Sequence, residues 1–420
     1  MNNRKSNKIN SIVWFVSTLS QSGGGERLLF EGASFFINRG IRVKVLTLET
    51  AKRDLFNNRY DNIDTVYYGM SNSYNNILEF FKKLHFTRKT IKLINPDYII
   101  VQSENNAIFI NLALVFIKIP IALFIFGQMF QFKNDLTKYA FIFKKQFSLI
   151  RNSMEGYKKE NPATKHIISL KKRLGNEIIA FMRYYFVKKT SPIFVLSRQV
   201  KWEVQKLYNK KAHVFKGAVP LKILNYKENK KIRNKFGLPD GPMFFSLSRL
   251  VPKKNVELCI HSFKAISTKN STAFLVIGGT GFHKKYLEEL VDNLGIKNKV
   301  YFIGYIPDTD LWDYYSMCDV FLHLDVADFT IVFYEVLCLG KKIILSVDTE
   351  IDSWLSNKEN VVMVKPNINS VINAMERIIS ENLTPPLKIE KQLLKQYTWE
   401  YNYSKVLQLL SILSVPPPLP

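Results

Sequence analysis

The chain has 420 residues, 47% of them hydrophobic, and a formal net charge of +25. This length is enough to bury two cores. The charge favours an anionic partner or surface, although a Lys-, Asn- and Ile-rich composition also arises without a functional cause. The three cysteines Cys259, Cys318 and Cys338 are widely separated, which argues against a disulfide framework and against paired zinc ligands. The polar N-terminus lacks the apolar segment of a signal peptide, so we expect a cytoplasmic protein.

The first predicted elements are a strand at 11–16, a glycine loop, a helix from about Glu26 that ends at Gly40, and a strand at 43–47. The loop contains Gly23, Gly24 and Gly25. Glycine lets a ligand approach the backbone closely, and a helix N-terminus offers free amide groups to an anion. The alternative is a tight strand-to-helix turn without a ligand.

Further strands are predicted at 63–67, 98–101, 121–126 and 193–196, with a helix at 77–94. Residues 107–126 have about the length of a membrane span, but Lys118 and Pro120 interrupt them. We therefore predict a buried helix up to Ile117 followed by a strand.

Residues 132–190 form a basic region with 14 Lys or Arg and 4 Asp or Glu. Aromatic residues alternate with cations in 139–150 and 178–187, a pattern typical of helices at an anionic lipid surface. A solvated surface over an ordinary core face is the alternative. Nucleic acid is not expected, because no known binding module accompanies these charges.

In the second half, strands are predicted at 243–247, 273–277, 300–303 and 320–323. Helices are predicted at 284–294, 311–318 and 331–339, closed in two cases by Gly295 and Gly340. Strands that alternate with helices indicate a doubly wound α/β sheet. Ligands of such sheets bind beyond the carboxyl ends of the strands, where 278–281 and 325–330 lie.

Several of these segments occur together in one known family. Phe245-Ser-Leu-Ser-Arg249-Leu-Val-Pro-Lys-Lys254, Gly278-Gly279-Thr-Gly281, Phe302-Ile-Gly304-Tyr-Ile-Pro307 and Tyr334-Glu335 followed by Gly340 resemble, in order and spacing, the retaining glycosyltransferases of family four. The resemblance covers most of the chain. It implies the GT-B fold, in which two Rossmann-like doubly wound domains face a cleft.

By this resemblance, the N-terminal acceptor-side domain spans 1–225 and the C-terminal nucleotide-sugar domain spans 226–396. A helix at 397–413 crosses back to the N-terminal domain, and a disordered tail covers 414–420.

The resemblance also implies a catalytic set. Arg249 and Lys254 would bind the departing diphosphate without a metal, and Glu335 would accept hydrogen bonds from ribose hydroxyls. The alternatives are two solvent-facing cations and a structural salt bridge, respectively. The expected substrate-binding residues are Gly23, Gly24, Gly25, Gly127, Gly279, Gly281, Asp325, Asp328, Phe329, Thr330 and Ile331. No cofactor or metal is expected, and the six histidines have no metal-like spacing.

Two positions depart from the family pattern. Ala327 stands where the family has an acidic residue that contacts the sugar, and Phe126 stands where it often has a histidine. Asp328 is the expected substitute for the missing acid.

We therefore expect a retaining enzyme that transfers a sugar from a nucleotide-diphosphate sugar to a glycan or lipid-linked acceptor in surface polysaccharide or glycoconjugate synthesis. It would lie on the inner face of the cell membrane. The two departures leave an alternative, a non-catalytic subunit of a glycosylation complex.

Overall fold

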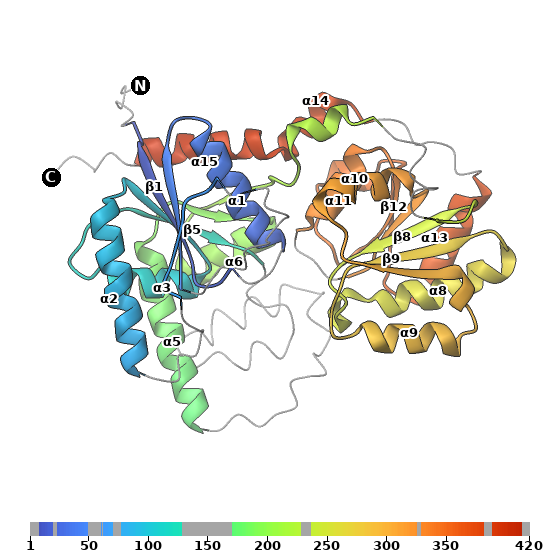
Figure 1. Cartoon of the computed structure of the whole chain (residues 1–420), viewed down its shortest axis with the longest axis horizontal. Helices are drawn as coiled ribbons and strands as arrows, with labels where there is room; N and C mark the ends of the chain where they lie inside the picture. The colour runs from blue at the N-terminus through green and yellow to red at the C-terminus, as the bar shows by residue number, and fades with distance from the viewer. Residues whose placement is uncertain are drawn as a thin grey trace. The chain divides into compact units, whose positions relative to one another are not determined.

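The computed structural model describes residues 8–19, 23–48, 60, 62–69, 77–127, 170–227, 237–325, 329–381 and 389–413. The chain forms two compact units (Figure 1). The first unit comprises Met1–Lys216 together with Glu400–Pro420, and the second comprises Gly217–Trp399.

The first unit contains a seven-stranded parallel sheet with the strand order β3-β2-β1-β4-β5-β6-β7. Its central strands are buried along their whole length and mostly apolar, because helices cover both faces of the sheet. The strands are β1 (Ser11–Val16), β2 (Arg42–Thr47), β3 (Thr65–Tyr67), β4 (Tyr98–Gln102), β5 (Ile121–Ile125), β6 (Ile193–Val195) and β7 (Ala212–Val214). The helices are α1 (Gly24–Ile37), α2 (Ile77–Ile94), α3 (Glu104–Ala113), α5 (Leu170–Lys189) and α6 (Arg198–Tyr208).

The helix α15 (Trp399–Leu413) completes the core of the first unit, although it follows the second unit in the chain. The ring of Tyr403 lies 6.2 Å from that of Trp14, and its hydroxyl donates a hydrogen bond to Leu28 O at 2.5 Å. A Cβ atom at Gly32 of α1 would lie 2.5 Å from Trp14 and 2.7 Å from Tyr403, so only glycine fits there. Figure 1 shows α15 beside α1 and β1.

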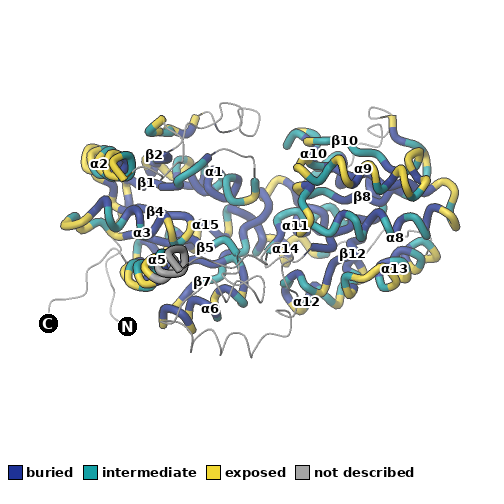
Figure 2. The backbone as a smooth tube through the Cα atoms, turned by 90° about the horizontal axis from the view of Figure 1, so that it is seen from below, coloured by how far each residue is buried: buried dark blue, intermediate teal, exposed yellow. Residues whose placement is uncertain are grey.

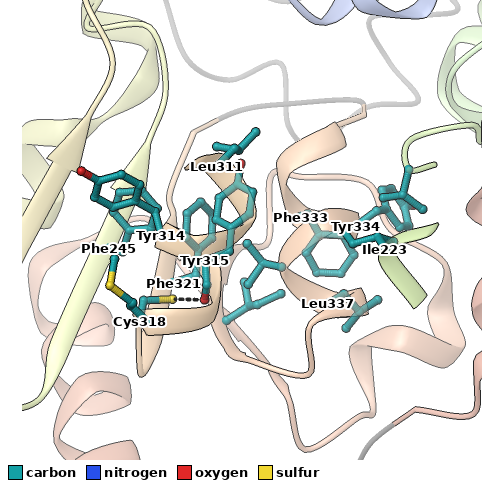
Figure 3. Close-up of a cluster of buried hydrophobic side chains, with 14 of the residues drawn as sticks. Ile223, Phe245, Leu311, Tyr314, Tyr315, Cys318, Phe321, Phe333, Tyr334 and Leu337 are labelled. Carbon is teal, nitrogen blue, oxygen red and sulfur yellow. Dashed lines mark hydrogen bonds between the residues drawn. The ribbon is translucent and has the colours of Figure 1, made fainter. Parts of the chain in front are cut away.

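The second unit contains a six-stranded parallel sheet with the order β10-β9-β8-β11-β12-β13. The strands are β8 (Met243–Leu247), β9 (Phe274–Gly278), β10 (Val300–Gly304), β11 (Val320–His323), β12 (Lys342–Ser346) and β13 (Val361–Val364). The helices are α8 (Val256–Lys269), α9 (Lys284–Asn293), α10 (Asp308–Met317), α11 (Ile331–Cys338), α12 (Ser353–Ser356), α13 (Ile368–Ser380) and α14 (Lys391–Leu394). Successive side chains of a strand point to opposite faces, so Phe244 and Phe245 enter different cores. Figure 3 shows the core that contains Phe245, Tyr315 and Phe321.

The break between the units lies before the segment 217–225, not after it as predicted. The amide groups of Ala218 and Val219 donate to Tyr397 O at 2.8 and 3.2 Å, and Ile223 and Leu224 are buried in the second unit's core. The crossover helix begins at Trp399, inside the predicted crossover segment 397–413, and Tyr397 before it belongs to the second unit's core. The predicted tail 414–420 lies outside the described residues.

The segment 107–126 is a helix followed by a strand, as predicted, although the helix α3 ends at Ala113 rather than Ile117. Within the described ranges, no helix combines the length and the apolar character needed to cross a bilayer. Figure 2 shows that the central strands of both sheets are buried, while α2 carries many exposed residues.

Candidate functional site

The strand order of the second unit has a topological switch point between β8 and β11. From β8 the chain proceeds through β9 to β10 on one side, and then returns to place β11 on the other side of β8. At such a switch point the loops that follow the two strands diverge and leave room for a ligand. These loops contain Arg249 and Lys254 after β8, and Asp325 after β11.

Lys254 and Asp325 join the two loops. Lys254 Nζ donates a short hydrogen bond to Asp325 Oδ2, and His323 Nε2 lies 2.6 Å from the other carboxylate oxygen of Asp325. Asp325 is 1% exposed and His323 is 5% exposed, whereas the Lys254 side chain is 22% exposed. Burial alone would raise the pKa of the Asp325 carboxyl, but the close contacts with the basic groups of His323 and Lys254 outweigh burial and hold that pKa well below its ordinary value.

Hydrogen bonds from side chains to backbone carbonyl groups also hold the loops after β8 and β11. Asn255 Nδ2 donates to Leu324 O at 2.9 Å, and Thr349 Oγ1 donates to Asp325 O at 3.1 Å. Asn255 adopts the left-handed conformation (φ 51°, ψ 34°), which asparagine tolerates better than most residues. Lys254 is therefore positioned by its turn as well as by its carboxylate partner.

Asp325 was predicted to bind the substrate, and in this structure its partners are internal. Its two oxygens face Lys254 and His323 inside the protein, so it can reach a sugar only by abandoning both. We therefore assign Asp325 to the positioning of Lys254. The expected substitute Asp328, like Ala327, lies outside the described residues.

The glycine turn after β9 packs directly on the loop that carries Arg249. Leu250 N donates to Thr280 O at 2.9 Å. A Cβ atom at Gly279 (φ +112°) would lie 1.9 Å from Ser248 O, and one at Gly281 would lie 2.1 Å from Leu250 O. These glycines are thus required by the approach of two loops, whether or not a ligand also contacts them.

Arg249 is exposed, and its guanidinium group has no polar partner among the residues that the structure describes. It differs in this respect from Lys254, which is already paired. The Arg249 guanidinium group can therefore donate two hydrogen bonds to one anion without first breaking a contact inside the protein.

Glu335 is 1% exposed, and its Oε2 accepts a hydrogen bond of 3.2 Å from Tyr315 OH. Tyr315 lies among the aromatic side chains of Phe245 and Phe321 (Figure 3). The resemblance implied that Glu335 accepts hydrogen bonds from ribose hydroxyls, and in this structure the hydroxyl that donates to it is that of Tyr315. Together with burial, Glu335 also raises the pKa of the Cys338 thiol far above its ordinary value.

The two residues before α11 and the first residue of that helix differ in exposure. Phe329 is half-buried and stacks on Tyr334 with ring centroids 5.3 Å apart. Thr330 is buried and precedes the helix in an extended conformation, while Ile331 begins the helix and is half-buried. All three lie at the ligand edge of the sheet.

In the first unit the switch point lies between β1 and β4. The helix α1 begins at Gly24 with Gly23 as its N-cap, and Gln102 Nε2 donates to Gly25 O at 3.4 Å. A Cβ atom at Gly25 would lie 3.6 Å from the ring of Phe126, and Gly127 follows with φ +135°. Phe126 thus fills the space next to the glycine loop.

His323 was not predicted as a site residue, because histidines were judged only by metal-like spacing. The useful signal was its position two residues before Asp325 at a strand end, since residues i and i+2 of an extended chain point to the same side. No group of three or more His, Cys, Asp or Glu side chains that could hold a metal ion occurs in the described parts of the chain.

Comparisons with known proteins complete this description. Residues 228–396 match the family model for glycosyl transferases group 1. An uncharacterized glycosyltransferase of Methanocaldococcus jannaschii is 26% identical over 49% of this chain and 55% of its own length. The GDP-mannose-dependent alpha-(1-6)-phosphatidylinositol monomannoside mannosyltransferase of Mycolicibacterium smegmatis is 25% identical over 36% of this chain and 42% of its length. The chain thus spans about half the length of these curated relatives.

Solved structures match over nearly the whole chain. A glycosyltransferase from Rickettsia africae has a TM-score of 0.71 and 16% identity, covering 97% of this chain and 99% of its own. The sucrose-phosphate synthase of Thermosynechococcus elongatus has a TM-score of 0.75 and 14% identity over 96% and 99%. The Anabaena protein HepE, in complex with UDP and glucose, has a TM-score of 0.70 and 14% identity over 96% and 100%. At these identities, the comparison shows a shared fold.

Proposed function

Because this chain has the GT-B fold and its residues 228–396 match the family model for glycosyl transferases group 1, we propose that it is a retaining glycosyltransferase that needs no metal. It transfers a sugar from a nucleotide-diphosphate sugar to a glycan or lipid-linked acceptor, in the synthesis of a surface polysaccharide or glycoconjugate. The observation that carries this proposal is the position of Lys254, which is held at the switch point in the loop that also presents Arg249.

The two cations would stabilise the leaving group. When the bond between the sugar and the diphosphate breaks, negative charge develops on the phosphate oxygens. Charge stabilisation accelerates the reaction only where it is stronger in the transition state than in the ground state. Arg249 can hold two phosphate oxygens at once, and Lys254 supplies a compact charge. The phosphate so held can assist an acceptor hydroxyl on the same face of the sugar, which retains the configuration.

Glu335 would contact the ribose. An ionised carboxylate can accept several hydrogen bonds, and the bond from Tyr315 occupies part of that capacity. Since Glu335 is 1% exposed, a ribose can reach it only if nucleotide binding moves the side chains that cover it. Two similar proteins support a nucleotide donor. One solved structure with a similar fold contains UDP and glucose, and one relative in sequence is named as GDP-mannose-dependent.

The acceptor side of the proposal rests on the first unit. In the described part of the basic region, α5 exposes Ile178, Ile179, Phe181 and Tyr185, while Lys188 and Lys189 lie over the rings of Tyr184 and Tyr185. The helix α2 adds an exposed hollow of about 530 Å³ in which Leu78 and Phe81 lie beside Lys82 and Lys89. Apolar side chains flanked by cations suit the interface of an anionic membrane. Residues 132–169 lie outside the described residues.

These features support peripheral attachment to the inner face of the cell membrane, where a lipid-linked acceptor would be available. Figure 1 shows the N-terminal ends of α2 and α5 pointing the same way within the first unit. Because helices run antiparallel to the strands here, these ends lie toward the carboxyl edge of the sheet, on the side where ligands of such sheets bind.

A panel of nucleotide sugars, screened by thermal unfolding and then by transfer assays, tests the proposal. A ligand at about 100 times its dissociation constant should stabilise the protein by roughly 2.7 kcal/mol. Turnover with retained anomeric configuration, in the presence of a chelator, would support it. Binding without turnover on any glycan or lipid acceptor would favour the non-catalytic subunit, and absence of any nucleotide binding would contradict the enzyme.

A further inference from the structure

His323, Asp325 and Lys254 form a chain in which one carboxylate faces two basic groups. Lys254 contacts Oδ2, and His323 lies 2.6 Å from Oδ1. The His323 contact is close but is not aligned as a hydrogen bond. A lysine side chain is ordinarily a cation at neutral pH, whereas a histidine side chain is a cation only when it is protonated. The charge of Asp325 can therefore be balanced by either neighbour.

Other charged groups near β11 do not compete for this carboxylate. The adjacent strand β8 has no titratable side chain. On the remaining elements packed around β11, Lys342 pairs with Glu381, Glu257 with His283, Glu335 with Tyr315, and Asp313 with Tyr226. The Cys259 thiol of α8 is close enough to feel the charge of Asp325, but burial raises its pKa to about 12, so it stays neutral and cannot balance the carboxylate. The balance at Asp325 thus depends on His323 and Lys254.

We propose that a bound diphosphate draws Lys254 away from Asp325, and that His323 takes up a proton from solvent to balance the carboxylate left behind. The inference rests on the nucleotide site proposed above. Lys254 is the mobile member, because its side chain is 22% exposed while Asp325 and His323 are almost wholly buried. The proton goes to His323 Nε2, the atom that faces Asp325 Oδ1.

The physical reason is the cost of leaving a buried carboxylate alone. Asp325 is 1% exposed, so water cannot replace the ammonium group that departs. A protonated His323 restores a cation at 2.6 Å without any movement of the backbone. Ligand binding and protonation then favour each other, and by linkage the affinity for the diphosphate must rise as the pH falls.

Calorimetric titration of the full chain with UDP and with GDP, near neutral pH and in buffers of different ionisation enthalpy, counts the protons exchanged on binding. The wild type should take up as much as about one proton, and its affinity should fall by up to about tenfold per unit of rising pH. In His323→Gln, which keeps a donor but cannot be charged, this uptake should disappear. The titration of the nucleotide phosphate itself is common to all variants and cancels in the comparison.

His283→Gln is the matched control, because His283 also contacts a carboxylate, that of Glu257, but lies outside the chain of three. It should take up as many protons as the wild type. Lys254→Met provides a second test if His323→Gln fails to fold. It should bind more weakly and without proton uptake, because Asp325 then keeps His323 as its partner in both states.

Nucleotide binding with equal proton uptake in the wild type and His323→Gln would overturn the inference and leave the proposed function intact. Absence of binding by either nucleotide, or by any sugar derivative of them, would overturn the proposed function and the inference together.

Discussion

Replacing Asp325 by Asn tests whether the contact between the loops after β8 and β11 stabilises the second unit. The substitution keeps the shape of the side chain but removes the charge that faces Lys254 and His323. Removing one partner of a buried ion pair costs about 3–5 kcal/mol. Because the Lys254 side chain is 22% exposed, solvent screens part of this loss, and we expect about 2–3 kcal/mol. For a unit of this size the melting temperature should fall by about 4–12 °C.

The pH dependence has a defined sign. The folded-state pKa of Asp325 is below its unfolded value, so its contribution is present above the unfolded pKa of about 3.9 and is lost as the pH falls through the folded pKa. The difference between wild type and Asp325→Asn should therefore be full at neutral pH and shrink only in strong acid.

Differential scanning calorimetry of the full chain measures this difference. Hydrogen exchange in peptides from β8 and β11 then assigns the shifted transition to the second unit. Asp292→Asn is the matched control, since Asp292 pairs with Lys297 at 3.2 Å on the exposed surface of the same unit. It should cost less than about 1 kcal/mol. Equal destabilisation by the two substitutions would refute the reasoning.

Three further predictions concern the two cations after β8, the glycine turn after β9 and the basic surface of α5. Arg249→Ala should lower kcat/KM about 100-fold or more in a transfer assay while leaving the melting temperature nearly unchanged, whereas Lys254→Ala should lower both, because only Lys254 has a buried partner. Gly279→Ala should destabilise the second unit by more than about 1 kcal/mol in thermal unfolding, since its φ is positive and Ser248 O occupies the space of a Cβ atom. Changing both Lys188 and Lys189 to Glu should release the protein from anionic vesicles in a co-sedimentation assay, as should added salt.

Each of these predictions has a control. An Arg249→Ala variant with wild-type activity would remove Arg249 from the site. Gly295→Ala also has a positive φ but open space around it, so a cost equal to that of Gly279→Ala would show that the approach of Ser248 is unimportant. Lys284 and Lys285 changed to Glu alter the charge by the same amount on α9 of the second unit. Equal release by that pair would mean that net charge, and not the surface of the first unit, holds the protein on vesicles.

The fold could be predicted because its determinants are local in the sequence. Apolar runs such as 11–16 and 243–247 and the glycines that end helices indicate alternating strands and helices, and the structure places these elements within a few residues of the predictions. The boundary between the units was placed too late because the segment 217–225 is stabilised by a distant partner, Tyr397. Such a contact leaves no periodic signal.

The site was predictable as a set of loops but not as a set of contacts. Lys254 and Asp325 are 71 residues apart; Lys254 was assigned to a ligand from the family resemblance, and Asp325 also from its position at a strand end. The structure shows them bonded to each other, because the switch point places the loops after β8 and β11 side by side. Glu335 similarly faces Tyr315, whose hydroxyl comes from a helix 20 residues earlier in the chain. Strand-end position predicts proximity to a ligand, but it does not decide whether a side chain points to the ligand or to a neighbour.

The return of α15 to the first unit determines when that unit can be finished during synthesis. The second unit is one continuous segment, Gly217–Trp399, and all of its residues leave the ribosome before Tyr403 does. The space around Trp14 and Gly32 stays incompletely filled until then, because the ring that fills it comes from α15. Domains generally fold in the order of their synthesis. Here the unit that is begun first must be completed last, and loss of α15 would expose the core of the N-terminal half of the chain.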